Sequence, residues 1–146
     1  MTRVYVDINR CIGCLSCEVA CERVHDGKGH INVHISEDRA SVPLFCHHCE
    51  EAVCTLICYS GALTKDGERT SFALDKCTGC GLCHLACPFG AVWTDKLAHK
   101  CDLCAPAEAS ACILTCPAQA LSNDYEEALK RARVRAGMAT IPRGKR

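Results

Sequence analysis

The stretch Cys77-Thr-Gly-Cys80-Gly-Leu-Cys83-His-Leu-Ala-Cys87-Pro88 spaces four cysteines as C-x₂-C-x₂-C-x₃-C before a proline. The same spacing occurs 66 residues earlier, at Cys11, Cys14, Cys17 and Cys21. Two further runs keep C-x₂-C and C-x₃-C but widen the middle gap to four and seven residues; they are Cys46, Cys49, Cys54, Cys58 and Cys101, Cys104, Cys112, Cys116. The sequence is therefore built on four cysteine runs, numbered here in sequence order.

The cysteine content allows either a disulfide scaffold or a metal-rich protein, since sixteen cysteines in 146 residues is about 11%. The first ten residues contain no apolar signal segment and no paired arginines, which predicts a cytoplasmic protein with reduced thiols. All sixteen cysteines fall into groups of four, whereas a disulfide framework needs only an even number. Metal ligation is therefore favoured over disulfides.

The spacing of the two regular runs is typical of bacterial iron–sulfur proteins, because three thiolates at two-residue intervals can surround one face of a cubane cluster. The fourth cysteine of such a run normally ligates a different cluster, so each run needs a partner. Zinc is the alternative, and it is strongest for the knuckle-like Cys46-His47-His48-Cys49. A zinc site there would leave Cys87 without a cluster, so we expect four [4Fe-4S] clusters.

Composition predicts a soluble protein with a thin core. The 49% hydrophobic content includes the cysteines, and only seven residues are aromatic. No window approaches the ~18 uninterrupted apolar residues of a membrane span. We therefore expect folding to be coupled to cluster insertion.

The formal net charge of zero hides an uneven distribution. Residues 1–122 carry ten Lys/Arg and fourteen Asp/Glu, whereas residues 123–146 carry seven and three. Ligated thiolates would make the body more negative still. The sequence thus predicts an acidic body with a basic tail.

The hydrophobic pattern repeats together with the cysteines. Alternation of apolar and polar residues at Arg3–Ile8 and at Ser71–Asp75 predicts a short strand before the first and the third runs.

Charged and turn-forming residues predict surface loops at Arg23–Ser41 and Leu63–Arg69. Small residues follow the last cysteine of three runs and predict a close backbone approach to a cluster, then a strand; they are Gly61-Ala62-Leu63, Gly90-Ala91-Val92 and Gln119-Ala120-Leu121. The pattern indicates two ferredoxin-sized units in tandem.

The segment 123–146 has a different composition. Asn123 and Glu126 can form a capping box, and Gly137 can end the helix that follows. The apolar stripe of this helix comprises Tyr125, Ala128, Leu129 and Ala132. We expect residues 138–146 to form an extended basic arm that docks on a partner.

The order of the runs, closed by Cys101-Asp-Leu-Cys104 and Ala111-Cys112-Ile-Leu-Thr-Cys116-Pro117, resembles the four-cluster iron–sulfur subunits of dimethyl sulfoxide reductase and formate dehydrogenase. That family includes small ferredoxin-like subunits that serve tungsten aldehyde oxidoreductases, carbon monoxide dehydrogenases and hydrogenases. The resemblance covers residues 4–121 and departs at Tyr59, where the family usually has proline. It implies an α+β fold of two bacterial-type ferredoxin modules, one nested within the other. The outer module would comprise about 1–36 and 92–122, and the inserted one about 37–91, with the carboxyl-terminal helix and arm at 123–146.

The resemblance also implies crossed ligation of four [4Fe-4S] clusters, in which each cluster takes three cysteines from one run and one from another. The implied sets are Cys11, Cys14, Cys17 with Cys116; Cys101, Cys104, Cys112 with Cys21; Cys46, Cys49, Cys54 with Cys87; and Cys77, Cys80, Cys83 with Cys58. Spacing alone would also permit the first run to pair with the second.

A set of one-electron cofactors without a substrate-pocket signature indicates an electron-transfer subunit rather than an enzyme, so no catalytic residue is expected. The resemblance implies a catalytic partner, with a tungsten or molybdenum aldehyde oxidoreductase favoured over carbon monoxide dehydrogenase, formate dehydrogenase or hydrogenase. A flavin- or NAD-linked subunit or a second copy of the same polypeptide would complete the path. The competing interpretations are a free-standing polyferredoxin and, more weakly, a nucleic-acid-binding protein with a structural cluster. We expect neither nucleic acid nor a membrane span.

His47, His48 and His84 lie between ligands, and Trp93 lies shortly after the third run. Hydrogen bonds from such histidines could tune a cluster potential, and Trp93 could lie on an electron path. Solvated or packing roles for the histidines, and a core role for Trp93, are the favoured interpretations.

Four complete cysteine quartets predict about sixteen iron and sixteen acid-labile sulfide per polypeptide. Metal and sulfide analysis of anaerobically purified protein checks this stoichiometry. Eight or fewer iron atoms, or stoichiometric zinc, would contradict the four-cluster interpretation.

Overall fold

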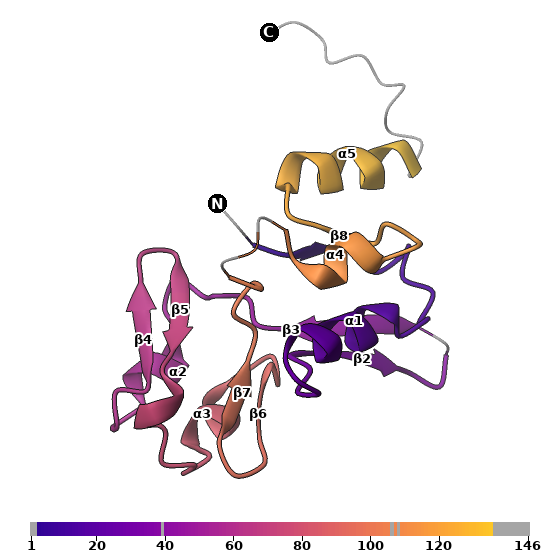
Figure 1. Ribbon diagram of the computed structural model, residues 1–146. Helices are drawn as coiled ribbons and strands as arrows, with labels where there is room; N and C mark the ends of the chain where they lie inside the picture. Colours follow the sequence, from indigo (N-terminus) through magenta and orange to yellow (C-terminus); the bar gives the residue numbers. More distant parts are fainter. Residues whose placement is uncertain (1–2, 39, 106, 108, 136–146) are drawn as a thin grey trace, which may run out of the picture.

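The computed structural model of the protein describes residues 3–38, 40–105, 107 and 109–135. Within these residues it has mixed α+β structure, with short helices and four separate two-stranded antiparallel sheets. Figure 1 shows the helices α2 and α3 with strands β4 to β7 on one side of the molecule. The helices α1 and α4 with strands β2 and β3 lie on the other side, below α5.

Three of the four sheets are hairpins between neighbouring segments, and one joins the two ends of the cysteine-bearing body. The pairs are β1 (Tyr5–Val6) with β8 (Leu121–Ser122), β2 (Ile31–Ile35) with β3 (Ser41–Phe45), β4 (Leu63–Asp66) with β5 (Arg69–Phe72), and β6 (Val92–Thr94) with β7 (Ala98–Lys100). The strand expected within Arg3–Ile8 is present as β1. The one expected at Ser71–Asp75 instead starts at Arg69 and ends at Phe72.

The prediction of two surface loops is wrong, because Arg23–Ser41 contains β2 and Leu63–Arg69 contains β4. The charged and turn-forming residues that suggested loops occupy the exposed positions and tight turns of hairpins. In the second hairpin Asp66 pairs with Arg69, and Gly67 between them has a φ of 57°. Glycine at the first position of a two-residue turn is typical of a type II′ hairpin.

In each run the first cysteine of the C-x₃-C half lies on a short helix, and the second lies on the same helix, directly after it or, for Cys58, two residues after it. These helices are α1 (Ser16–Val24), α2 (Val53–Leu56), α3 (Leu82–Ala86) and α4 (Ala111–Thr115). Pro88 and Pro117 follow the cysteines that end α3 and α4, as expected of a residue that cannot continue a helix. Helix α1 packs against α4, and α2 packs against α3.

The buried side chains form two clusters, and both contain cysteines. The first draws on both ends of the cysteine-bearing body and comprises Val4, Cys17, Cys21, Ile31, Phe45, Leu103, Cys112 and Leu121. The second comprises Leu63, Cys83, Val92 and Ala98. Neither cluster is large, which agrees with the thin core expected from the composition.

The carboxyl-terminal helix is α5 (Tyr125–Arg135). The expected cap at Asn123 is wrong by one residue, because Asp124 Oδ1 accepts the N–H groups of Glu126 and Glu127 at 2.8 and 3.2 Å. The Asp124 carboxylate reaches both donors of the first turn. The Tyr125 ring lies 5.5 Å from that of Tyr5, so the helix packs on β1. The expected arm at 138–146 and the helix end at Gly137 lie outside the described residues.

None of the helices in the described ranges is long and apolar enough to cross a membrane.

Gly79 and Gly81 provide a matched test of backbone packing in the third run. Both have a left-handed φ, of 70° and 76°. A Cβ on Gly79 would overlap the carbonyl oxygen of Lys96 in the β6–β7 turn, whereas one on Gly81 would meet nothing within 4 Å.

We predict that Gly81→Ala lowers the free energy of unfolding by about 1–2 kcal/mol through backbone strain alone. Gly79→Ala should cost about 1–3 kcal/mol more, because the β6–β7 turn must move. Thermal unfolding of the anaerobically reconstituted variants measures the difference. Equal losses would show that the contact with Lys96 does not constrain the cysteine loop.

Candidate metal centres

Three cavities are each lined by four cysteines, three from one run and one from another. One cavity is lined by Cys11, Cys14, Cys17 and Cys116. A second is lined by Cys46, Cys49, Cys54 and Cys87, and a third by Cys58, Cys77, Cys80 and Cys83. The shared donor set favours the same kind of group in each cavity.

The remaining four cysteines, Cys21, Cys101, Cys104 and Cys112, come from α1, α4 and the loop after β7. Burial raises the pKa of the Cys112 thiol to about 12, and the nearby Cys104 and Cys21 thiols act in the same direction. Burial also raises the pKa of Cys101 to about 12. Thiolates in this position need a cation to hold their charge, which iron supplies.

The other buried ligand positions have the same property. Burial raises the pKa of Cys17 to about 11, and it also raises the pKa values of Cys54 and Cys83. None of the sixteen cysteines, all of which are described, forms a disulfide. The donor chemistry therefore fits iron–sulfur clusters, as the sequence predicted.

The last cysteine of every run accepts a backbone N–H on its sulfur. The donors to Cys21, Cys58, Cys87 and Cys116 are the N–H groups of His30, Leu63, Ala91 and Ala120, at 3.2 to 3.4 Å. Hydrogen bonds to sulfur favour the thiolate and raise the potential of a cluster that it ligates.

The small residues after these cysteines have the expected role in three runs. Ala62, Ala91 and Ala120 are buried and lead into β4, β6 and β8. The residue before each of them has a left-handed φ, of 68° at Gly61, 60° at Gly90 and 49° at Gln119. This turn sends the backbone back past the sulfur.

A second repeated feature was not evident from the sequence. The residue before the second cysteine of every run has a left-handed φ, and these residues are Gly13, His48, Gly79 and Leu103. Glycine adopts this conformation readily, but His48 and Leu103 give no such signal. Only their alignment with the glycines of the regular runs could have revealed it.

The three histidines that could have adjusted a cluster's reduction potential make contacts with other parts of the protein. His48 is buried and its Nδ1 accepts the Thr70 N–H at 3.1 Å, while burial lowers its pKa to about 3. His47 packs against Phe89, and His84 Nδ1 lies 2.6 Å from the Val92 carbonyl oxygen. These contacts agree with the favoured interpretation of solvated or packing histidines.

Trp93 also has a structural role. Its ring stacks on His99 with centroids 4.1 Å apart, and its Nε1–H donates to the Gly29 carbonyl at 2.9 Å. The indole thus joins β6 to the segment after α1.

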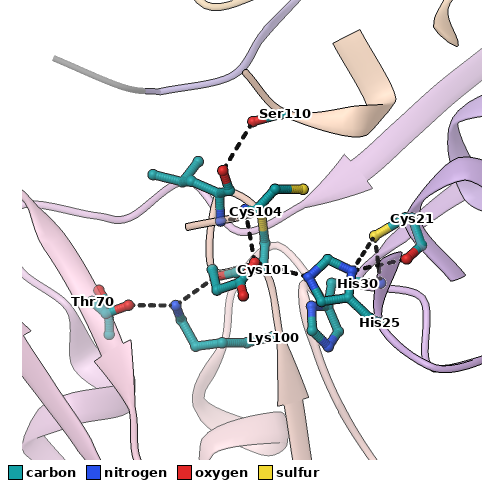
Figure 2. A network of polar contacts seen from close by, with 10 residues as sticks. Cys21, His25, His30, Thr70, Lys100, Cys101, Cys104 and Ser110 are labelled. Atoms are coloured by element: carbon teal, nitrogen blue, oxygen red, sulfur yellow. Dashed lines mark hydrogen bonds and ion pairs between the residues drawn. The ribbon is translucent and has the colours of Figure 1, made fainter. Parts of the chain in front are cut away.

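A network of polar contacts lies beside Cys21 and Cys104 (Figure 2), and it was not predicted from the sequence. His25 Nε2 lies 3.0 Å from Asp102 Oδ1, and its Nδ1 lies 2.8 Å from the Cys21 carbonyl oxygen. Burial alone would raise the Asp102 pKa, but the Cys104 N–H and the His25 ring hold it below its usual value. The i,i+4 spacing of Cys21 and His25 was the one available signal.

Residues 37–126 match the family model described as a 4Fe-4S dicluster domain. The sequence is 32% identical over 169 residues to an iron–sulfur protein of Rhodospirillum rubrum, covering 90% of this protein and 88% of that one. It is 30% identical over 168 residues to the B subunit of the anaerobic dimethyl sulfoxide reductase of Escherichia coli (strain K12), covering 95% and 81%.

A third relative is much longer. UacF, a candidate oxidoreductase of Escherichia coli (strain K12), is 38% identical over 137 residues, which make up 85% of the present sequence and only 21% of UacF. The present sequence thus spans about a fifth of the length of that relative.

The cysteine-lined cavities on an α+β scaffold, together with these matches, define an iron–sulfur protein. The family match covers more than half of the sequence, and this protein belongs to the 4Fe-4S dicluster domain family.

Proposed function

We propose that this protein passes single electrons through four [4Fe-4S] clusters between a catalytic oxidoreductase subunit and another redox partner. The observation that carries the proposal is the set of three cavities, each lined by four cysteines from two different runs. A tungsten or molybdenum aldehyde oxidoreductase is the first candidate for the catalytic partner. The relative that is a subunit of dimethyl sulfoxide reductase supports a place within a multisubunit oxidoreductase.

The proposed ligands follow the crossed pattern in all four sites. The cysteines that line each cavity would hold one cluster, and the four that remain would hold the fourth: Cys21, Cys101, Cys104 and Cys112. In addition to burial, the Cys104 thiol raises the pKa values of both Cys21 and Cys112, and the Cys112 thiol acts in the same direction on Cys101, which supports this last set.

The short helices would set the spacing between the sites. Cys17 and Cys21 lie four residues apart on α1, which corresponds to about 6 Å along a helix axis. Each therefore serves a different site, and α4 does the same with Cys112 and the cysteine at its end, Cys116. Helices α2 and α3 repeat the arrangement with the other two sites, so the clusters would lie in two close pairs.

The nested modules remain part of the proposal. The first core cluster contains Phe45 and Leu103, whereas the second contains Val92 and Ala98. This distribution favours an inserted module between about 46 and 100 rather than between 37 and 91.

The clusters supply one-electron oxidation and reduction, and the residues around them adjust how readily each one accepts an electron. Backbone N–H groups on the sulfurs stabilise negative charge, and exclusion of water opposes it. The protein has no need of a substrate pocket, because the chemistry belongs to its partner.

Cys21→Ser tests the crossed ligation. We predict that it perturbs the cluster of Cys101, Cys104 and Cys112 and spares the cluster of Cys11. Paramagnetic resonance spectra of Cys21→Ser, Cys101→Ser and Cys11→Ser, each reduced anaerobically, make the comparison. The nested assignment is wrong if the spectrum of Cys21→Ser resembles that of Cys11→Ser.

The function itself is tested by anaerobic purification of the tagged protein from its own cells. We expect a catalytic subunit containing tungsten or molybdenum to co-purify, and its substrate to bleach the iron–sulfur absorption. Cys21→Ser should keep the complex but slow electron passage to the final acceptor, because one step of the path is altered. A protein that purifies alone and exchanges electrons with unrelated donors would instead be a free polyferredoxin.

A further inference from the structure

Lys100 is a buried cation at the end of β7. Only 3% of the residue is exposed, and in the described part of the protein it is the one lysine or arginine among the buried residues. Its Nζ donates hydrogen bonds to the carbonyl oxygens of Thr70 and Cys101 at 2.6 and 2.8 Å (Figure 2). Among the described side chains, no carboxylate lies within ion-pair distance of this ammonium group.

The two carbonyl partners of Lys100 belong to two different cysteine sites. Thr70 lines the cavity of Cys46, Cys49, Cys54 and Cys87. Cys101 belongs to the set that does not line any of the three four-cysteine cavities. The ammonium group therefore lies between these two sites and is attached to the backbone of both.

The carboxylates near Lys100 do not balance its charge. Asp26 and Asp102 line the cleft beside it, but Asp26 is exposed, and Asp102 is bonded to His25 and to the Cys104 N–H. A buried ammonium is costly unless an anion compensates it. A cubane with four thiolates is negatively charged in both of its usual states, so the two flanking clusters would provide that anion.

We propose that Lys100 is the shared counter-cation of the two clusters at this junction, and that it raises the reduction potential of both. The proposal rests on the proposed function and its crossed ligands. An electron that crosses the junction oxidises one cluster and reduces the other, and no proton or further reactant is needed. Lys100 stabilises the added negative charge on either side and offsets the repulsion when both clusters are reduced.

The thiols of both sites respond to this charge. Burial raises the pKa values of Cys54 and Cys101, and at both positions the charge of Lys100 acts in the opposite direction. The same field would favour the reduced state of a cluster held by these sulfurs.

Lys100→Met removes the charge while keeping the length of the side chain, and Lys100→Gln also keeps a hydrogen-bond donor. Lys100→Arg retains the charge. Lys65→Met is the matched control, because Lys65 Nζ also bonds a ligand carbonyl, that of Cys49, but is exposed to solvent. Water and salt screen an exposed charge, so its removal should have little effect.

The readout is a redox titration of each full-length variant followed by paramagnetic resonance. In Lys100→Met and Lys100→Gln we expect the one-electron equilibrium constant to fall at least tenfold at the two junction clusters, which is about 59 mV. The other two clusters should shift less, Lys100→Arg should recover most of the change, and Lys65→Met should match the wild type.

The proposal would be supported if Lys100→Met lost a junction cluster while Lys100→Gln kept that cluster at a lower reduction potential. Unchanged potentials in Lys100→Gln, or equal shifts at all four clusters, would overturn it and leave the relay intact. Iron content separates this failure from that of the proposed function. A wild-type protein with eight or fewer iron atoms would overturn both.

Discussion

The structure depends on one geometric constraint, the four-residue spacing of the last two cysteines in every run. On a helix this spacing displaces the second sulfur by about one turn, so the two sulfurs reach different cavities. Cys112 lies on α4 and Cys116 ends it, and only Cys116 lines the cavity of the first run. Because every short helix contributes to two sites, a cluster would tie together segments that are distant in sequence. The packing of α1 on α4 and of α2 on α3 follows from the same requirement.

A consequence of this arrangement is that the proposed ligands form part of the core. Cys17, Cys21 and Cys112 belong to the first buried cluster, where their thiols pack as small apolar groups. The burial that stabilises the neutral thiol opposes the thiolate that iron requires, as the raised pKa of Cys112 shows. Iron bound by these thiolates would therefore have to offset the free-energy cost of their desolvation. The N–H groups aimed at the last sulfur of each run lower that cost at the points where the backbone turns away.

The cysteine runs and the turns that follow them could be predicted from the sequence, because they depend on residues that are close together in it. The turn at Ala91 and the strand after it were predicted in this way. The helix ends before Pro88 and Pro117 are equally local, because proline cannot continue a helix. The hairpins β2–β3 and β4–β5 were missed because their exposed faces have the composition of loops. The buried pairing of Lys100 with Thr70 was also missed, since it joins residues 30 positions apart and depends on how β5 and β7 lie together.

The junction between the two cysteine-rich halves shows how such long-range contacts bear on electron transfer. Contacts that cross it include the hydrogen bond from the indole of Trp93 to Gly29 and the bonds of Lys100 to Thr70 and Cys101. Electron transfer needs a fixed distance between centres, and these directional bonds set it more firmly than a small apolar contact would. Two negatively charged clusters on either side of this junction would repel each other. A single buried cation between them would offset that repulsion and allow both clusters to be reduced.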